Sequence, residues 1–138
     1  MPFAETLGQV LGSFITEVAK DEQSTSPNYA YILFEAAALT LTFVKSNQAA
    51  FTAVEDQLTP ALNTIIEKNN TDYMGYAFQL YATFVASTGQ MKENYGLLCQ
   101  SLLEKPENWS KEMKFLIPAM GTYLVTVICK FPEYANQQ

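Results

Sequence analysis

The sequence lacks arginine and histidine altogether, and its basic residues are eight lysines among 138 residues. Because arginine is the side chain best suited to bidentate recognition of phosphate, its absence argues against phosphate-rich ligands. The net charge of −6 also argues against DNA or RNA, since proteins that bind nucleic acid usually present a basic stripe. We therefore predict no nucleic-acid partner. An acidic surface would suit a basic protein partner, although solubility explains the charge equally well.

The absence of histidine also removes the commonest general base and metal ligand. Cys99 has no histidine with which to form a nucleophile–base pair, and two cysteines are too few for a tetrahedral zinc site. The six glycines are scattered, so no glycine-rich phosphate loop is present. Cys99 and Cys129 both lie in apolar helical runs, and we interpret them as small buried hydrophobic residues.

Neighbouring carboxylates are the remaining candidates for acid–base chemistry. The pairs Glu55 with Asp56 and Glu104 with Glu107 could be proposed, but each lies in a polar stretch that we expect to be solvated. We therefore predict that the chain is not an enzyme and that it has no catalytic, cofactor-binding or metal-binding residues.

One uncharged stretch, residues 36–44, requires a test for membrane insertion. Glu35 and Lys45 bound it, so it is far shorter than the ~20 apolar residues that a membrane-spanning helix needs. We predict no membrane partner, and we interpret the stretch as a helix buried on most sides in the middle of a layered helical stack.

Apolar residues recur at the helical period in most of the chain, and no segment shows the two-residue alternation of a strand. The sequence therefore predicts an all-α fold, with helices over about residues 3–20, 28–45, 49–68, 71–88, 92–104 and 117–130. Pro60 lies inside the third helix and should bend or restart it. Phe131 and Pro132 should end the sixth helix, and the last residues of the chain should fray. The side chains predicted to face inward include Leu7, Leu11, Phe14, Ile15 and Val18 in the first helix, Tyr73, Ala77, Leu80, Tyr81, Phe84 and Val85 in the fourth, and Leu98, Leu102 and Leu103 in the fifth.

The helices follow one another in similar pairs. Phe34 and Ala38 recur as Phe78 and Ala82, 44 residues later. A period near 44 with loops of uneven length is typical of HEAT-type helix pairs, and it does not fit a rigid period of about 34 residues. We predict a right-handed α-solenoid of about three helix pairs, with approximate repeats over residues 1–46, 47–89 and 90–131.

Two polar residues occupy matching positions in the apolar second helices. Glu35 lies between Phe34 and Ala36, and Gln79 holds the matching position one repeat later. Because a buried charge must be paired, we interpret both residues first as structural, at a solvated edge or in a polar seam between helical layers. The alternative is that they face a partner on the concave surface, and this makes Glu35 and Gln79 the candidate partner-binding residues.

Several short phrases occur in an order and spacing that resemble a known family. They are Ser26-Pro27-Asn28-Tyr29 with Tyr31-Ile32-Leu33-Phe34-Glu35-Ala36, then Tyr76-Ala77-Phe78-Gln79, then Asn108-Trp109 with Ile117-Pro118-Ala119. Together they resemble the middle of the importin-α re-exporters, the CAS or exportin-2 family of the importin-β karyopherin superfamily. Departures from the family phrases, such as Thr122 where the family tends to have an arginine, mark a divergent member.

The resemblance implies a HEAT-repeat solenoid of which this chain is an internal fragment. It also implies that the whole protein binds importin-α as cargo together with Ran in its GTP state, meets nuclear pore proteins, and shuttles between nucleus and cytoplasm. No cofactor is implied. The alternative is a generic helical-repeat scaffold or adaptor of another pathway, which would bind other partners with the same architecture.

The single tryptophan, Trp109, lies in the turn after Pro106, and the resemblance to the family phrase implies that it anchors that loop on the helical stack. If Trp109 is buried there, replacing it with alanine should lower the free energy of unfolding by about 3–5 kcal/mol, because a large cavity remains. Thermal unfolding followed by circular dichroism measures the change. An unaltered melting temperature would show that Trp109 anchors nothing.

Overall fold

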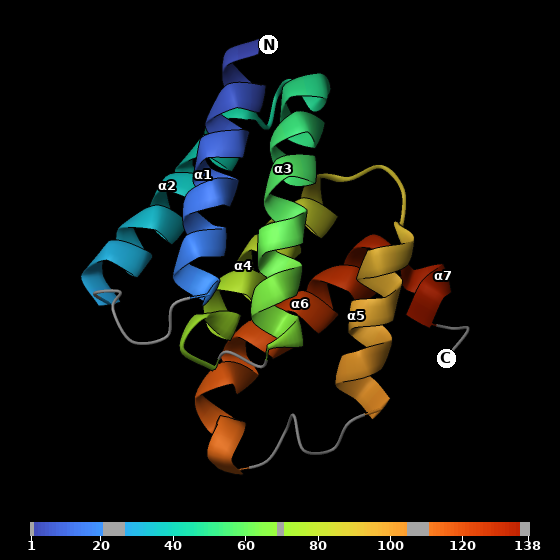
Figure 1. Ribbon diagram of the computed structural model, residues 1–138. Helices are drawn as coiled ribbons and strands as arrows, with labels where there is room; N and C mark the ends of the chain where they lie inside the picture. Colours follow the sequence, from blue (N-terminus) through green and yellow to red (C-terminus); the bar gives the residue numbers. More distant parts are fainter. Residues whose placement is uncertain (1, 21–26, 69–70, 105–110, 136–138) are drawn as a thin grey trace. The chain divides into compact units, whose positions relative to one another are not determined.

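The structure is a computed structural model that describes residues 2–20, 27–68, 71–104 and 111–135 (Figure 1). Within these ranges every regular element is helical and none is a strand, which confirms the prediction of an all-α fold. The elements are α1 (Pro2–Lys20), α2 (Pro27–Val44), α3 (Gln48–Glu67), α4 (Thr71–Ser87), α5 (Glu93–Glu104), the 3₁₀ helix η2 (Lys111–Leu116), α6 (Ile117–Lys130) and the short α7 (Pro132–Ala135). Trp109 lies outside the described residues.

The helix boundaries follow from local chemistry. Asn47 precedes α3, and its side-chain oxygen accepts a hydrogen bond from the backbone N–H of Ala50 at 3.1 Å, which satisfies one of the unpaired donors of the first turn. Pro118 lies at the start of α6, where a missing N–H costs nothing. Pro60, however, does not restart α3, because the helix runs on through it to Glu67.

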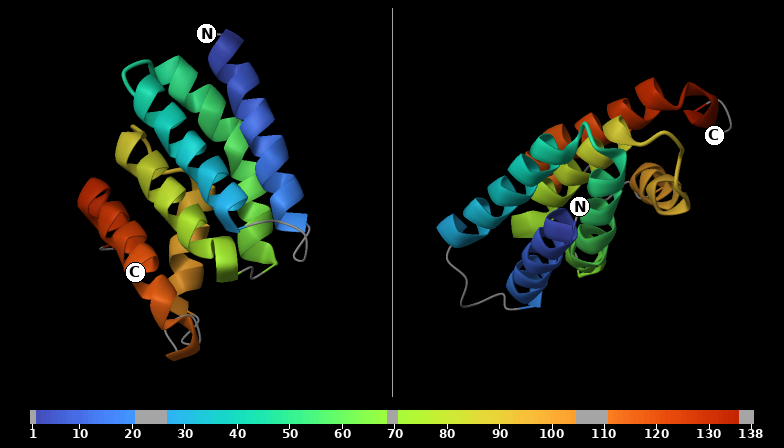
Figure 2. Two further views of the ribbon diagram at one scale, coloured as in Figure 1. Left: turned by 90° about the vertical axis from the view of Figure 1, so that its left-hand side faces the viewer. Right: turned by 90° about the horizontal axis from the view of Figure 1, so that it is seen from above.

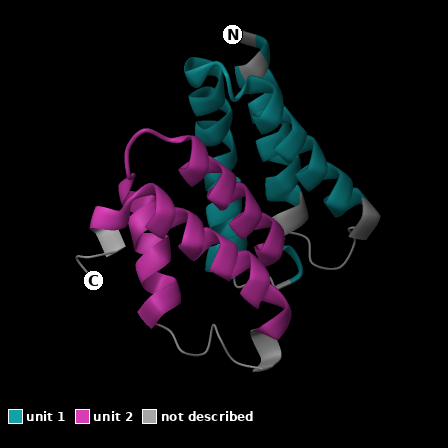
Figure 3. Ribbon diagram, turned by 180° about the vertical axis from the view of Figure 1, so that it is seen from behind, with its two compact units in different colours: residues 1–73 teal, residues 74–138 magenta. Residues whose placement is uncertain are grey.

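The chain divides into two compact units, residues 1–73 and 74–138 (Figure 3). The two units are defined by which residues contact one another in space, and they carry no information on sequence repeats. The predicted repeat boundaries at residues 46 and 89 therefore remain a prediction. We describe each unit by itself.

Unit 1 depends on the close approach of α1 to α3, which lie side by side in Figures 1 and 2. Gly8 and Gly12 are buried one turn apart on α1. A Cβ atom at Gly12 would lie 2.6 Å from the carbonyl oxygen of Gln57, and one at Gly8 would lie 3.2 Å from the Cα of Val54. Gly12 is therefore needed for the backbones of the two helices to come this close, and at Gly8 a side chain would make a contact tighter than usual.

The remaining core of unit 1 is apolar. Its fully buried side chains include Ile15, Ala37, Leu41, Phe51, Val54, Leu58, Leu62 and Ile65. At the start of α4, the ring of Tyr73 lies against Phe34 of α2 with the centroids 6.0 Å apart.

Unit 2 is organised around a cluster of buried tyrosines from α4, α5 and α6. The ring of Tyr81 meets Tyr95 edge-on at 6.0 Å and Tyr123 at 6.3 Å between centroids. The Tyr123 hydroxyl donates a buried hydrogen bond of 2.7 Å to the backbone carbonyl of Tyr95, which joins α6 to α5. The Tyr95 hydroxyl is buried without a hydrogen-bond partner in the described chain, an arrangement that costs about 1–3 kcal/mol.

Most of the predicted inward faces are confirmed, but several positions at their edges are wrong. Leu11, Ile15, Tyr81, Phe84, Val85 and Leu102 are buried as expected, whereas Phe14, Leu103 and Cys129 are exposed. Phe14 and Leu103 each lie next to a buried position, so a rotation of one residue, about 100°, separates the two sides. Cys129 lies between two exposed residues near the end of α6. The side chain of Val18 lies outside what the structure describes.

Two further expectations are corrected. Glu55 is not solvated, because only 2% of it is exposed in the core of unit 1. The stretch 36–44 is not buried on most sides, since Leu39 and Phe43 are largely exposed. Pro132 begins the short α7, and residues 136–138, which were expected to fray, lie outside the described part of the chain.

The α1–α3 contact predicts how two glycine substitutions differ. In Gly12→Ala the new methyl group must push the Gln57 carbonyl aside, so we expect a loss of about 1–3 kcal/mol in the free energy of unfolding. Gly121→Ala is the matched control, since nothing lies within 4 Å of its Cβ in α6. It should gain up to about 1 kcal/mol from helix propensity. Urea denaturation of both variants checks the difference, and a Gly12→Ala variant as stable as the control would contradict the close approach.

Candidate partner-binding surface

The helix α2 shows large apolar side chains on its outer side. Its buried positions, such as Ala30, Ala37 and Leu41, face the core of unit 1. On the opposite side Ile32, Leu39 and Phe43 are 62%, 66% and 82% exposed. With Glu35, these residues follow one another at intervals of three and four, so they share one face of the helix. We call Ile32, Glu35, Leu39 and Phe43 the α2 outer face.

Both candidate partner-binding residues are exposed. Glu35 lies on α2 in unit 1, and Gln79 lies on α4 in unit 2. The Glu35 carboxylate forms no hydrogen bond or ion pair with the described residues. Glu35 therefore occupies a solvated position, and its part in partner binding stays a prediction, as does that of Gln79.

The three apolar members of the α2 outer face were not identified from the sequence. In α2 almost every residue is apolar, so the period carries no information on which side faces solvent. Glu35 was the only available signal, because a lone carboxylate in such a helix marks the side that water reaches.

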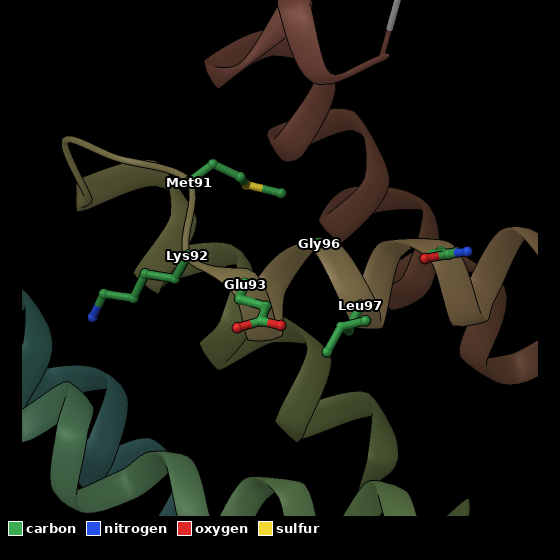
Figure 4. Close-up of a pocket in the computed structure, with 6 residues that line it drawn as sticks. Met91, Lys92, Glu93, Gly96 and Leu97 are labelled. Carbon is green, nitrogen blue, oxygen red and sulfur yellow. The ribbon is translucent and has the colours of Figure 1, made fainter. Parts of the chain in front are cut away.

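The hollows among the described residues of unit 2 include two shallow ones. One, of about 320 Å³, lies along the start of α5 and is lined by Met91, Lys92, Glu93, Gly96, Leu97 and Gln100 (Figure 4). The Lys92 ammonium lies 5.9 Å from the centre of the Tyr95 ring, close enough for a cation–π contact. The other hollow, of about 340 Å³, is lined by Ala86 of α4 with Val125, Thr126, Cys129 and Lys130 of α6.

The first hollow contains one carboxylate, Glu93, and one ammonium, Lys92, whereas the second contains Cys129 and Lys130 but no carboxylate. The described residues contain no cluster of three or more cysteine, aspartate or glutamate side chains that could hold a metal ion. Glu55 is buried and its neighbour Asp56 is exposed, so the two carboxylates do not converge. Glu107 lies outside the described residues. None of the described helices is both long enough and apolar enough to cross a membrane.

Comparison with known proteins identifies the family. A family model described as "CAS/CSE protein, C-terminus" matches residues 1–138. The chain belongs to the CAS/CSE family. It is also similar to exportin-2 of Drosophila melanogaster, with 29% identity over 115 residues that cover 80% of this chain. The matched region is 12% of that relative, so the chain spans about an eighth of its length. No solved structure matches this chain.

The family match confirms the resemblance that the short phrases indicated, and it changes one detail. The phrases resemble the middle of the re-exporters, whereas the matching family model describes the C-terminal part of CAS/CSE proteins. We therefore assign the chain to that C-terminal part.

The two cysteines differ in a way that can be measured. Cys99 is buried, and desolvation raises the pKa of its thiol, whereas Cys129 is an exposed free thiol at the edge of a hollow. Because the thiolate is the reactive form, iodoacetamide at neutral pH should label Cys129 at least about tenfold faster than Cys99. Peptide mass spectrometry over time measures both rates. In denaturant the two rates should become equal, and equal rates in the folded protein would show that the assigned burial is wrong.

Proposed function

We propose that this chain is a segment of a nuclear transport receptor that exports importin-α from the nucleus in complex with Ran-GTP. The observation that supports this proposal is the family match over the whole chain, together with the similarity to exportin-2. In this proposal the parent protein shuttles between nucleus and cytoplasm and meets nuclear pore proteins on the way. The activity is non-enzymatic and needs no cofactor.

The segment itself has two roles in this proposal. Its packed helices provide a stretch of HEAT-type scaffold, in repeats near residues 1–46, 47–89 and 90–131. Its second helices provide part of the protein-binding surface, with the α2 outer face as the best-defined portion. Exposed apolar residues gathered on one helix face are typical of protein interaction sites, because monomers rarely leave such patches uncovered.

The parent protein provides the direct test of the proposed cargo and partner. Immobilised parent should retain importin-α only when Ran loaded with a non-hydrolysable GTP analogue is also present. Ran loaded with GDP is the control and should leave importin-α in the flow-through. Failure to form the three-protein complex with the GTP analogue would refute export of importin-α and would favour the scaffold of another pathway.

A substitution on the α2 outer face tests the role of this segment within that complex. Phe43→Ala should weaken assembly of the complex by about tenfold, or ~1.4 kcal/mol, if the ring is covered by a partner. Because 82% of Phe43 is exposed, its removal should leave folding intact. Leu103→Ala is the control, since Leu103 is also a large exposed apolar residue, at 55%, but lies on α5. Equal effects of the two substitutions would contradict a specific role for α2.

A further inference from the structure

We infer that the α2 outer face binds a helical segment in which apolar side chains flank a single cationic one, with Glu35 as the counter-charge. This inference rests on the proposed function, because it specifies the chemistry of a partner at the same surface. The partner must then carry a positive charge opposite Glu35, and neither the family match nor the fold implies this charge.

The α2 outer face has the length and the side-chain spacing of a site for a second helix. From Ile32 to Phe43 the α2 outer face extends about 16 Å along the helix, which is three turns. Its three exposed apolar side chains lie on one side at intervals that match the facing side of a second helix. An amphipathic helix laid along α2 would therefore place its own apolar residues against Ile32, Leu39 and Phe43.

The helix α2 carries a single charged side chain, Glu35, in the middle of this surface. Glu35 is the only residue between Pro27 and Val44 that is charged at neutral pH, and it lies between Ile32 and Leu39 on the same face. It is in the middle of the helix, where neither helix end compensates its charge. Its carboxylate makes no hydrogen bond or ion pair with the described residues.

The apolar side chains and the carboxylate between them together select the charge of the partner helix. A helix that covers Ile32 and Leu39 also removes water from the carboxylate between them. A desolvated carboxylate without a counter-charge is strongly unfavourable, so apolar partners that lack a cation are rejected and acidic ones are repelled. A lysine or arginine opposite Glu35 restores the lost interaction and fixes the register of the two helices.

The chain also contains a natural comparison for Glu35. At the matching position of α4 it carries Gln79, which is exposed and has almost the same shape but no charge. Glu35→Gln therefore places on α2 the same uncharged amide side chain that α4 already carries at Gln79, so the variant should fold normally.

The experiment uses the complete 138-residue chain and two synthetic amphipathic helical peptides. Both peptides carry leucines at the same positions on one face, and they differ only in a central lysine or glutamate. We expect the lysine peptide to bind at least about tenfold more tightly, as measured by fluorescence anisotropy. Amide chemical shifts should change along residues 32–43. Glu35→Gln should remove most of this preference, and Glu35→Lys should reverse it.

Two variants serve as controls. Glu67→Gln removes the same charge from an exposed position on α3, and it should keep the preference for lysine. Phe43→Ala should weaken both peptides without changing their ratio, because it removes apolar contact only.

Three results would overturn the inference: no binding of the lysine peptide at millimolar concentration, equal affinity for both peptides, or an equal effect of Glu67→Gln and Glu35→Gln. The peptide experiment and the test of the proposed function can fail independently of each other. If the peptides are discriminated but the complex with importin-α and Ran does not form, only the proposed cargo and partner fail. If the complex forms but the peptides are not discriminated, only the counter-charge role of Glu35 fails.

Discussion

The close approach of α1 to α3 is the constraint on which unit 1 depends. At Gly12 the backbone of α1 passes so near the Gln57 carbonyl that no side chain fits between the two helices. This contact fixes the distance between α1 and α3, and the apolar residues beside it, such as Ile15 and Leu58, are buried as a result. With these two helices held together, α2 needs only one side to complete the core, and its other side is left in contact with solvent.

Unit 2 uses large side chains where unit 1 uses glycines. Tyr81, Tyr95 and Tyr123 fill the space between α4, α5 and α6, and one hydroxyl reaches a backbone carbonyl across that space. Aromatic rings bury much area while losing few rotamers, so three of them can hold short helices such as α5. The unsatisfied hydroxyl of Tyr95 is a cost that this packing must offset.

Much of the fold could be predicted from the helical period, and the reasons for the errors are physical. The period located α6 at residues 117–130, where the structure places it, because Pro118 and Pro132 bound a strongly apolar run. It misplaced Phe14 and Leu103 because the width of a buried face depends on the neighbouring helix. The close packing at Gly12 joins residues far apart in the sequence, and a single sequence carries no sign of such a contact. For the candidate site, Glu35 was found from its unusual surroundings, whereas Ile32, Leu39 and Phe43 were hidden among other apolar residues.

The helix α2 carries large apolar residues on both sides, with Leu33, Phe34 and Leu41 buried and Ile32, Leu39 and Phe43 exposed. The buried residues stabilise unit 1, whereas the exposed ones gain little from folding of unit 1 alone. Exchanging the exposed residues should therefore change which partner binds while the stability of the unit stays the same. This separation lets a repeat protein acquire new specificity one helix at a time.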